Sequence, residues 1–209
     1  MAAAAQIQLD IWSDYVCPFC YLELPIIERL KAELGRALQV EWHPFELRPE
    51  PVRPLDPGGK YLLETWTNSV YPLAAQRKMT LRMPSVQPRS RKAFEAAYFA
   101  REQGLFDHMH HALFKAFFED GKDIGSISAL VHIGRGVGLE ADALQEALES
   151  NRFKPQVLQE EVVAAAYGVN AVPILTARRY DERLTNARAL SGAVDYPRVR
   201  ELVASLQHG

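Results

Sequence analysis

The sequence predicts an α/β fold with an inserted helical subdomain, and three observations lead to this prediction. Residues 6–45 carry the patterns of a strand, a helix and a second strand in succession. A block of roughly a hundred residues with apolar residues at helical spacing follows. Strand-like segments return after Gly168. Strands at both ends of the chain, with helices between them, indicate one fold that carries an insertion.

The first three elements form a parallel βαβ unit in this prediction. The stretch QIQLDIW, residues 6–12, alternates apolar and polar side chains, which is typical of a strand. From Pro18 onward apolar residues recur at helical spacing, and Gly35 stands where a helix commonly ends. The stretch ALQVEWHPF, residues 37–45, predicts the second strand, and a strand–helix–strand order favours parallel pairing.

The middle of the chain predicts a loop and then helices. Residues 46–59, ELRPEPVRPLDPGG, are too rich in Pro and Gly for a helix or strand, so we expect an ordered loop. The apolar faces that follow are interrupted near Gly104, and Pro155 is placed to open a further helix. We interpret the aromatic residues of these helices as core residues, since any packed helix shows such spacing.

The C-terminal part predicts strands and a closing helix. Three elements follow from its patterns: a β-rich segment at 169–177, a hairpin partner at 183–192 and an amphipathic helix at 195–206. We therefore expect one domain built from residues 6–57 and 164–208, with residues 58–163 as the inserted helical subdomain.

Composition limits the classes of partner. The 209 residues are 48% hydrophobic and 24% charged, which suffices for a core without a covalent staple. A net charge of −2 and scattered Lys and Arg residues favour neither nucleic acid nor anionic lipid. The first residues lack the basic start of a signal peptide, and no apolar stretch approaches the roughly 20 residues of a membrane span. We expect a soluble, cytoplasmic protein.

Chemistry concentrates at Cys17 and Cys20, the only two cysteines of the chain. They stand in the motif CPFC at the predicted junction of the first strand and helix. Residues at i and i+3 of a helix are neighbours, so a disulfide can close with a small adjustment. In a reducing compartment such a pair is more often catalytic, redox-sensing or metal-binding than a permanent staple.

The predicted position gives the two cysteines unequal roles. The unpaired N–H groups and the positive end of the helix stabilise a thiolate, and Cys17 lies nearer to them than Cys20. We expect Cys17 to be the exposed attacking thiolate and Cys20 the more buried resolving thiol. Pro18 suits the first helical turn, and Phe19 adds apolar surface beside the attacking sulfur.

Two other interpretations of the cysteines stay open. A structural zinc site would need two histidines beside the cysteines. His108 and His111 are predicted to face solvent and His110 to pack at the apolar edge of a helix, so we expect no metal. The cysteines could also be inert packing residues. For Asp14 we favour a helix cap or solvated turn residue over a proton relay for the dithiol.

The chain resembles the DsbA family. The resemblance rests on CPFC opening a helix, the helical insertion, and then GVNAVPIL followed by ALSGA. The stretch VEWHPFELRP, residues 40–49, resembles its FrnE-like cytoplasmic branch in particular. The resemblance implies a thioredoxin-like fold and a thiol–disulfide oxidoreductase. It also implies a cis Val172–Pro173 bond against Cys17, with Val172 pairing with a substrate backbone and Pro173 keeping an N–H away from the thiolate.

Related proteins leave alternatives for the function. The family also includes glutathione-dependent isomerases and transferases, so an aromatic or polyketide-like small molecule stays open as the substrate. Glutathione stays open as a redox partner or cosubstrate, and no other cofactor is expected. A third hypothesis is a peptide-binding or chaperone-like module that uses the apolar surface around Phe19 and Val172. The direction of the redox reaction, the physiological substrate and the oligomeric state do not follow from the sequence.

Overall fold

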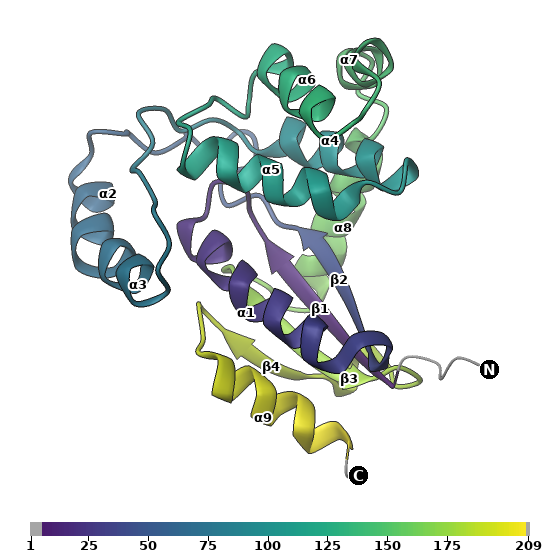
Figure 1. Ribbon diagram of the computed structural model, residues 1–209. Helices are drawn as coiled ribbons and strands as arrows, with labels where there is room; N and C mark the ends of the chain where they lie inside the picture. The colour runs from purple at the N-terminus through teal and green to yellow at the C-terminus, as the bar shows by residue number, and fades with distance from the viewer. Residues whose placement is uncertain (1–5, 208–209) are drawn as a thin grey trace. The chain divides into compact units, whose positions relative to one another are not determined.

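The computed structural model describes residues 6–207, and the chain folds as two compact units (Figure 1). Within the described residues, the sheet unit comprises 6–45 and 162–207, and the helical unit comprises 46–161. The sequence places the first boundary after residue 57. The structure places it at the end of the second strand, so the Pro-rich loop belongs to the helical unit.

The sheet unit contains a four-stranded mixed sheet with the order β2-β1-β3-β4. Its strands are β1 (Ile7–Ser13), β2 (Leu38–Pro44), β3 (Ile174–Arg179) and β4 (Arg188–Ser191). Strand β1 pairs parallel with β2 and antiparallel with β3, and β3 pairs antiparallel with β4. The predicted α/β class and the parallel βαβ unit are confirmed, and the N-terminal and C-terminal segments share one sheet.

Two helices pack on one face of this sheet, α1 (Pro18–Leu34) and α9 (Tyr196–Gln207) (Figure 1). A short 3-10 turn, η1 (Gly35–Ala37), follows α1, and another, η3 (Leu184–Asn186), precedes β4. Gly35 has a φ of 51° and an open Cβ position, so the residue that ends α1 is there for its backbone conformation. Leu9 and Ile11 are fully buried and supply the apolar face of the central strand.

The polar residues of β1 are buried as well, which the alternation of the sequence does not predict. Asp10 is 3% exposed and accepts hydrogen bonds from Gln8 at 2.9 Å and Arg178 at 3.3 Å, and its carboxylate lies 3.1 Å from His43 Nε2. Burial by itself raises the pKa of Asp10, but the hydrogen bonds and positive charges around it outweigh burial and hold that pKa below its usual value. The second face of the sheet is therefore stabilised by a polar network.

In the helical unit, α4 (Arg91–Glu102) packs against α5 (Phe106–Phe118), α6 (Ile127–Gly136) and α7 (Ala141–Glu149). The turn η2 (Trp66–Val70), which is π-helical, packs against α2 (Lys60–Thr65) and α3 (Tyr71–Gln76). Most of α8 (Lys154–Ala166) also belongs to this unit. The predicted break at Gly104 separates α4 from α5. His110 is 3% exposed, whereas His108 and His111 are exposed, as their spacing on the helix predicts.

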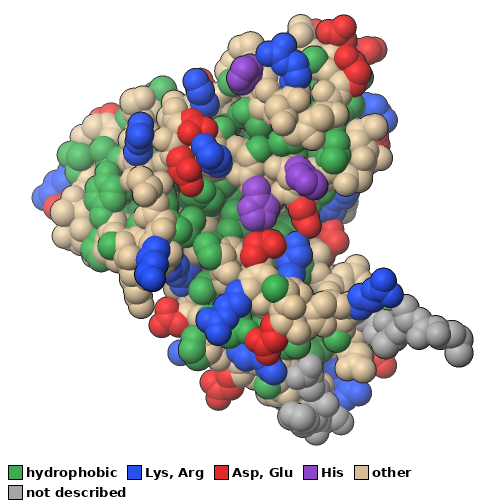
Figure 2. All heavy atoms as spheres, viewed as in Figure 1, with side chains coloured by type: hydrophobic (Ala, Val, Ile, Leu, Met, Phe, Trp, Pro, Cys, Tyr) green, Lys and Arg blue, Asp and Glu red, His purple; other side chains and the backbone are tan. Residues whose placement is uncertain are grey.

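Basic and acidic side chains are interspersed over the face of the molecule shown in Figure 2. Among the residues that the structure describes, no helix combines the length and the apolar character needed to cross a membrane.

Two glutamates and an arginine form a partly buried cluster in the helical unit. Arg91 forms an ion pair with Glu46 and lies 4.0 Å from the carboxylate of Glu161. One buried oxygen each of Glu46 and Glu161 has no hydrogen-bond donor among the described residues. Burial and the neighbouring Glu46 carboxyl raise the pKa of Glu161 to about 7, although Arg91 opposes the shift.

This cluster makes the stability of the protein depend on pH. The pKa of Glu161 rises from 4.5 to about 7 on folding. Between these values the folded state binds more protons than the unfolded state, so stability falls as pH rises. Glu161→Gln removes the ionisation. We expect it to raise the free energy of unfolding at about pH 8, by roughly 1 to 2 kcal/mol after solvent screening of the partly exposed carboxyl, and to change it little near pH 4.

Urea denaturation followed by circular dichroism at both pH values tests this expectation. Glu64→Gln is the matched control, because the Glu64 side chain is 59% exposed in a surface pair with Lys60. An equal stability difference between wild type and Glu161→Gln at both pH values would contradict the assignment.

Candidate active site

A tight turn after β1 delivers the chain to the first cysteine. The backbone N–H of Cys17 donates to the carbonyl of Asp14 at 3.0 Å, and the N–H of Val16 donates to the Asp14 carboxylate at 3.2 Å. Asp14 lies in a turn, as expected, but it is fully buried, so the prediction that it is solvated is wrong. The Asp14 side chain does not cap α1.

Cys17 is the N-cap residue of α1. Its backbone is extended, with φ −93° and ψ 112°, and Pro18 occupies the first turn, where a missing N–H costs no hydrogen bond. The carbonyl of Cys17 accepts from the backbone N–H of Cys20 at 3.1 Å. The Cys17 side chain therefore lies at the N-terminal end of α1, where the helix dipole favours negative charge, and Cys20 lies one turn further along the helix.

A loop from the far end of the chain reaches the same place. The thiol of Cys17 donates to the backbone carbonyl of Val172 at 3.6 Å, across 155 sequence positions. The Val172–Pro173 peptide bond is cis, and β3 begins at the next residue, Ile174. Trp12 near the end of β1 is in register with Ile174, so the pairing of β1 and β3 holds the loop against the helix N-terminus.

Both cysteines are reduced and buried. Cys17 is 4% exposed and Cys20 is fully buried. The sequence predicts an exposed Cys17, and this is wrong in degree, because the loop at Val172 covers the sulfur. Pro18 and Phe19, between the cysteines, are partly exposed.

The thiol of Cys20 is held in its protonated form. Burial raises the pKa of Cys20 well above its usual value, and the neighbouring Cys17 sulfur raises it further through a hydrogen bond and through charge. The second cysteine of the motif is therefore a poor nucleophile as long as it stays in this environment.

A cavity of about 320 Å³ lies in the sheet unit and was not predicted from the sequence. It is lined by Trp12, Tyr167, Gly168, Val169, Ile174, Thr176, Leu184, Thr185, Ala187 and Ala189. The Nε1 of Trp12 is buried without an acceptor among the described residues. Val172 packs against an apolar cluster that contains Trp12 and Val169, so residues that line the cavity also support the loop at Cys17. No local motif marks it, because its lining comes from three separate segments.

The described residues do not offer a metal centre. No group of three or more His, Cys, Asp or Glu side chains within residues 6–207 is arranged to hold a metal ion.

Comparison with known proteins gives a family match over most of the chain. The model of the family described as DSBA-like thioredoxin domain matches residues 8–204. The uncharacterized protein YwbO of Bacillus subtilis is 34% identical over 176 residues, which cover 80% of this chain and 84% of YwbO.

Solved structures show the same fold at low sequence identity. The probable DsbA oxidoreductase SCO1869 of Streptomyces coelicolor has a TM-score of 0.76 and 20% identity, covering 96% of this chain and 90% of that one. A 2-hydroxychromene-2-carboxylate isomerase has a TM-score of 0.74 and 19% identity, covering 96% and 94%. The cytosolic disulfide reductase DsbM of Pseudomonas aeruginosa, solved with glutathione, has a TM-score of 0.69 and 17% identity, covering 96% and 97%.

The unequal thiols predict a strict order of alkylation. Iodoacetamide at about pH 8 should modify Cys17 first, because the pKa of Cys20 is raised and its sulfur is fully buried. Mass spectrometry of tryptic peptides after short exposure measures the order, with Cys17→Ser as the matched control in which modification of Cys20 stays slow. Equal labelling of both residues at the earliest times would contradict the asymmetry.

Proposed function

Because the chain belongs to the DsbA-like thioredoxin-domain family, we propose that it is a thiol–disulfide oxidoreductase in which Cys17 attacks and Cys20 resolves. The observation that carries this proposal is the asymmetry of the pair. Cys17 is the N-cap residue of a helix beside a backbone carbonyl, and Cys20 is a fully buried thiol with a raised pKa.

The proposed reaction consists of two exchanges. The Cys17 thiolate attacks one sulfur of a substrate disulfide, forms a mixed disulfide and releases the other sulfur as a thiolate. Cys20 then loses its proton and attacks the Cys17 sulfur, which releases the second substrate thiol. The substrate gains two electrons and the CPFC pair becomes a disulfide. The raised pKa of Cys20 delays the second step until the mixed disulfide has removed the charge from Cys17.

The loop at Val172 is proposed to bind the substrate backbone. The Val172 carbonyl accepts a hydrogen bond from the Cys17 thiol in the free protein. A substrate that replaces this contact reaches the sulfur and can pair with the Val172 backbone as an added strand. Pro173 has no backbone N–H to compete for the thiolate. Pro18 and Phe19 supply the partly exposed surface on the other side.

A cytoplasmic, FrnE-like setting with glutathione as the redox partner is part of the same proposal. Its support is the stretch VEWHPFELRP and the fold shared with a cytosolic reductase solved with glutathione. In that setting two glutathione molecules reduce the CPFC disulfide and leave as glutathione disulfide. The redox equilibrium of the pair in glutathione buffers, followed by thiol labelling, shows whether the protein reduces or oxidises its substrate.

Two cysteine variants separate the proposed roles. Cys17→Ser should lower reduction of a small model disulfide to the uncatalysed rate, because it removes the attacking sulfur. Cys20→Ser should still react once and accumulate a stable mixed disulfide, visible by mass spectrometry. The second variant is the matched control for the first, since both replace a buried thiol by a hydroxyl. Wild-type turnover by Cys17→Ser would rule out the proposal.

A glutathione-dependent isomerase is the second candidate, and the cavity beside Ile174 favours it. The cavity has mainly apolar walls and one buried indole N–H without an acceptor, which suits an aromatic molecule that carries a carbonyl oxygen. The fold is shared with an isomerase of such a compound.

Isothermal titration calorimetry with glutathione, alone and with an aromatic keto acid, tests this candidate. The expected result is binding of the keto acid that weakens by about tenfold in Trp12→Phe, which keeps an aromatic ring to stack on His43 but lacks the N–H. No heat for either compound at millimolar concentration would remove the isomerase from consideration.

A further inference from the structure

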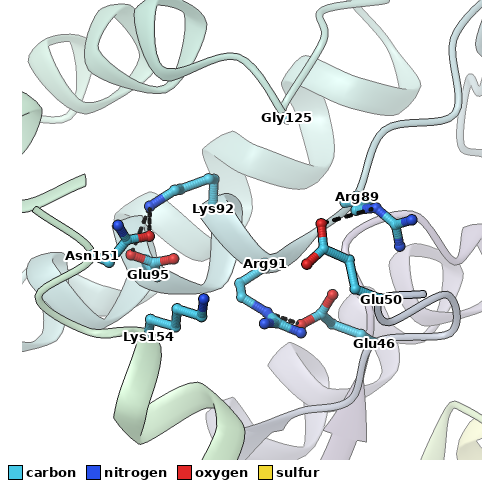
Figure 3. A pocket seen from close by; sticks show the side chains of 9 residues that line it. All are labelled: Glu46, Glu50, Arg89, Arg91, Lys92, Glu95, Gly125, Asn151 and Lys154. Carbon is cyan, nitrogen blue, oxygen red and sulfur yellow. Dashed lines mark hydrogen bonds and ion pairs between the residues drawn. The ribbon is translucent and has the colours of Figure 1, made fainter. Parts of the chain in front are cut away.

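The helical unit contains a second pocket, whose lining includes no residue of the dithiol site. It has a volume of about 220 Å³ and lies where the loop before α4, α4 itself, the loop before α6 and the start of α8 come together (Figure 3). Its lining consists of Glu46, Glu50, Arg89, Arg91, Lys92, Glu95, Gly125, Asn151 and Lys154. Seven of these nine residues are charged, which is unusual for a space that only separates packed helices.

Three of the four cations in the lining already have a carboxylate partner. Arg91 forms an ion pair with Glu46, Lys92 lies 3.1 Å from Glu95, and Arg89 lies 3.7 Å from Glu50. These contacts use all three carboxylates of the lining.

Lys154 is the fourth cation and has no such partner. Among the described residues, 6–207, no hydrogen bond or ion pair involves its amino group, and Figure 3 shows the side chain pointing into the pocket. Lys154 is also the first residue of α8, a helix of 13 residues, and the positive end of its dipole adds to the charge. This side of the pocket favours an anionic group.

The carboxylate of Glu95, in contrast, requires a hydrogen-bond donor. This residue is fully buried, and one of its carboxylate oxygens, Oε1, has no hydrogen-bond donor among the described residues. The other oxygen, Oε2, is the one that Lys92 contacts. Burial raises the pKa of Glu95 although Lys92, Arg91 and Lys154 oppose the shift, so the surrounding cations do not fully compensate for its desolvation. This side of the pocket favours a positively charged donor.

We propose that the pocket binds a free α-amino acid, with the carboxylate at Lys154 and the ammonium group at Glu95. An anion alone leaves the Glu95 oxygen without a donor, and a cation alone leaves Lys154 without a partner, whereas a zwitterion satisfies both. The volume lies below the roughly 300 Å³ at which pockets for drug-sized ligands begin, which suits a molecule of this size. Because all lining residues belong to the helical unit, the inference is independent of the reaction at Cys17.

Calorimetry on the full chain tests the proposal with glycine, l-alanine, l-glutamine and l-glutamate as probes. At least one of them should bind. For the tightest probe, its N-acetyl derivative lacks the ammonium charge and its amide derivative lacks the carboxylate, and each should bind at least about tenfold more weakly. These comparisons change the ligand and leave the protein intact, so they do not depend on the folding of a variant.

The protein side is tested by Lys154→Met, which keeps the length of the side chain and removes its charge. It should weaken binding by about tenfold or more, while Lys60→Met, at a position 86% exposed on α2, should bind like wild type. Reduction of a model disulfide should be the same in all three proteins. The proposal is overturned if no probe binds at about 10 mM, if the N-acetyl derivative binds as well as its parent, or if Lys154→Met binds like wild type.

Discussion

The antiparallel pairing of β3 with β1 is the constraint on which the candidate active site depends. Strand β1 is central in the sheet and buried along its whole length, so it fixes both neighbours, β2 in parallel and β3 in antiparallel orientation. The register that sets Trp12 opposite Ile174 brings the cis Val172–Pro173 bond to the start of α1. Cys17 and Val172 are 155 positions apart in the sequence, and one ladder of backbone hydrogen bonds brings them together.

The turn between β1 and α1 then decides how the two sulfurs differ. It places Cys17 at the N-cap of α1, where its thiol donates to the Val172 carbonyl, and it places Cys20 one turn deeper, where the side chain is fully buried. Desolvation penalises a charged Cys20 more than any nearby group compensates. The difference in environment between the two cysteines thus results from the geometry of a single helical turn.

The helical unit adds a different kind of chemistry. Its polar interior contains carboxylates that are only partly compensated, at Glu95 and at the Glu46–Glu161 pair, beside a lysine without a partner. Buried charges of this kind reduce stability unless something binds to them or a proton is shared. The insertion therefore contains groups that respond to solutes and to pH, and its apolar core supports them.

The sequence by itself determined the α/β class, the parallel βαβ unit, the helical insertion and the CPFC pair at a helix N-terminus. These features depend on periodicity and on residues a few positions apart, which local patterns record. The contact of Val172 with Cys17 was available only through resemblance to a family, because no local pattern encodes a pairing across most of the chain.

Tertiary structure alone decided the burial of Cys17 and of the polar face of β1, the cavity beside Trp12 and the charged pocket around Lys154. Each of these depends on which distant segments come together. Alternation along β1 predicts which side chains share a face of the sheet. It does not predict that Asp10 contacts His43 and Arg178 instead of water, because these two residues lie on strands from other parts of the chain. The sequence therefore predicted the CPFC pair and its position on a helix, but not the residues that surround it.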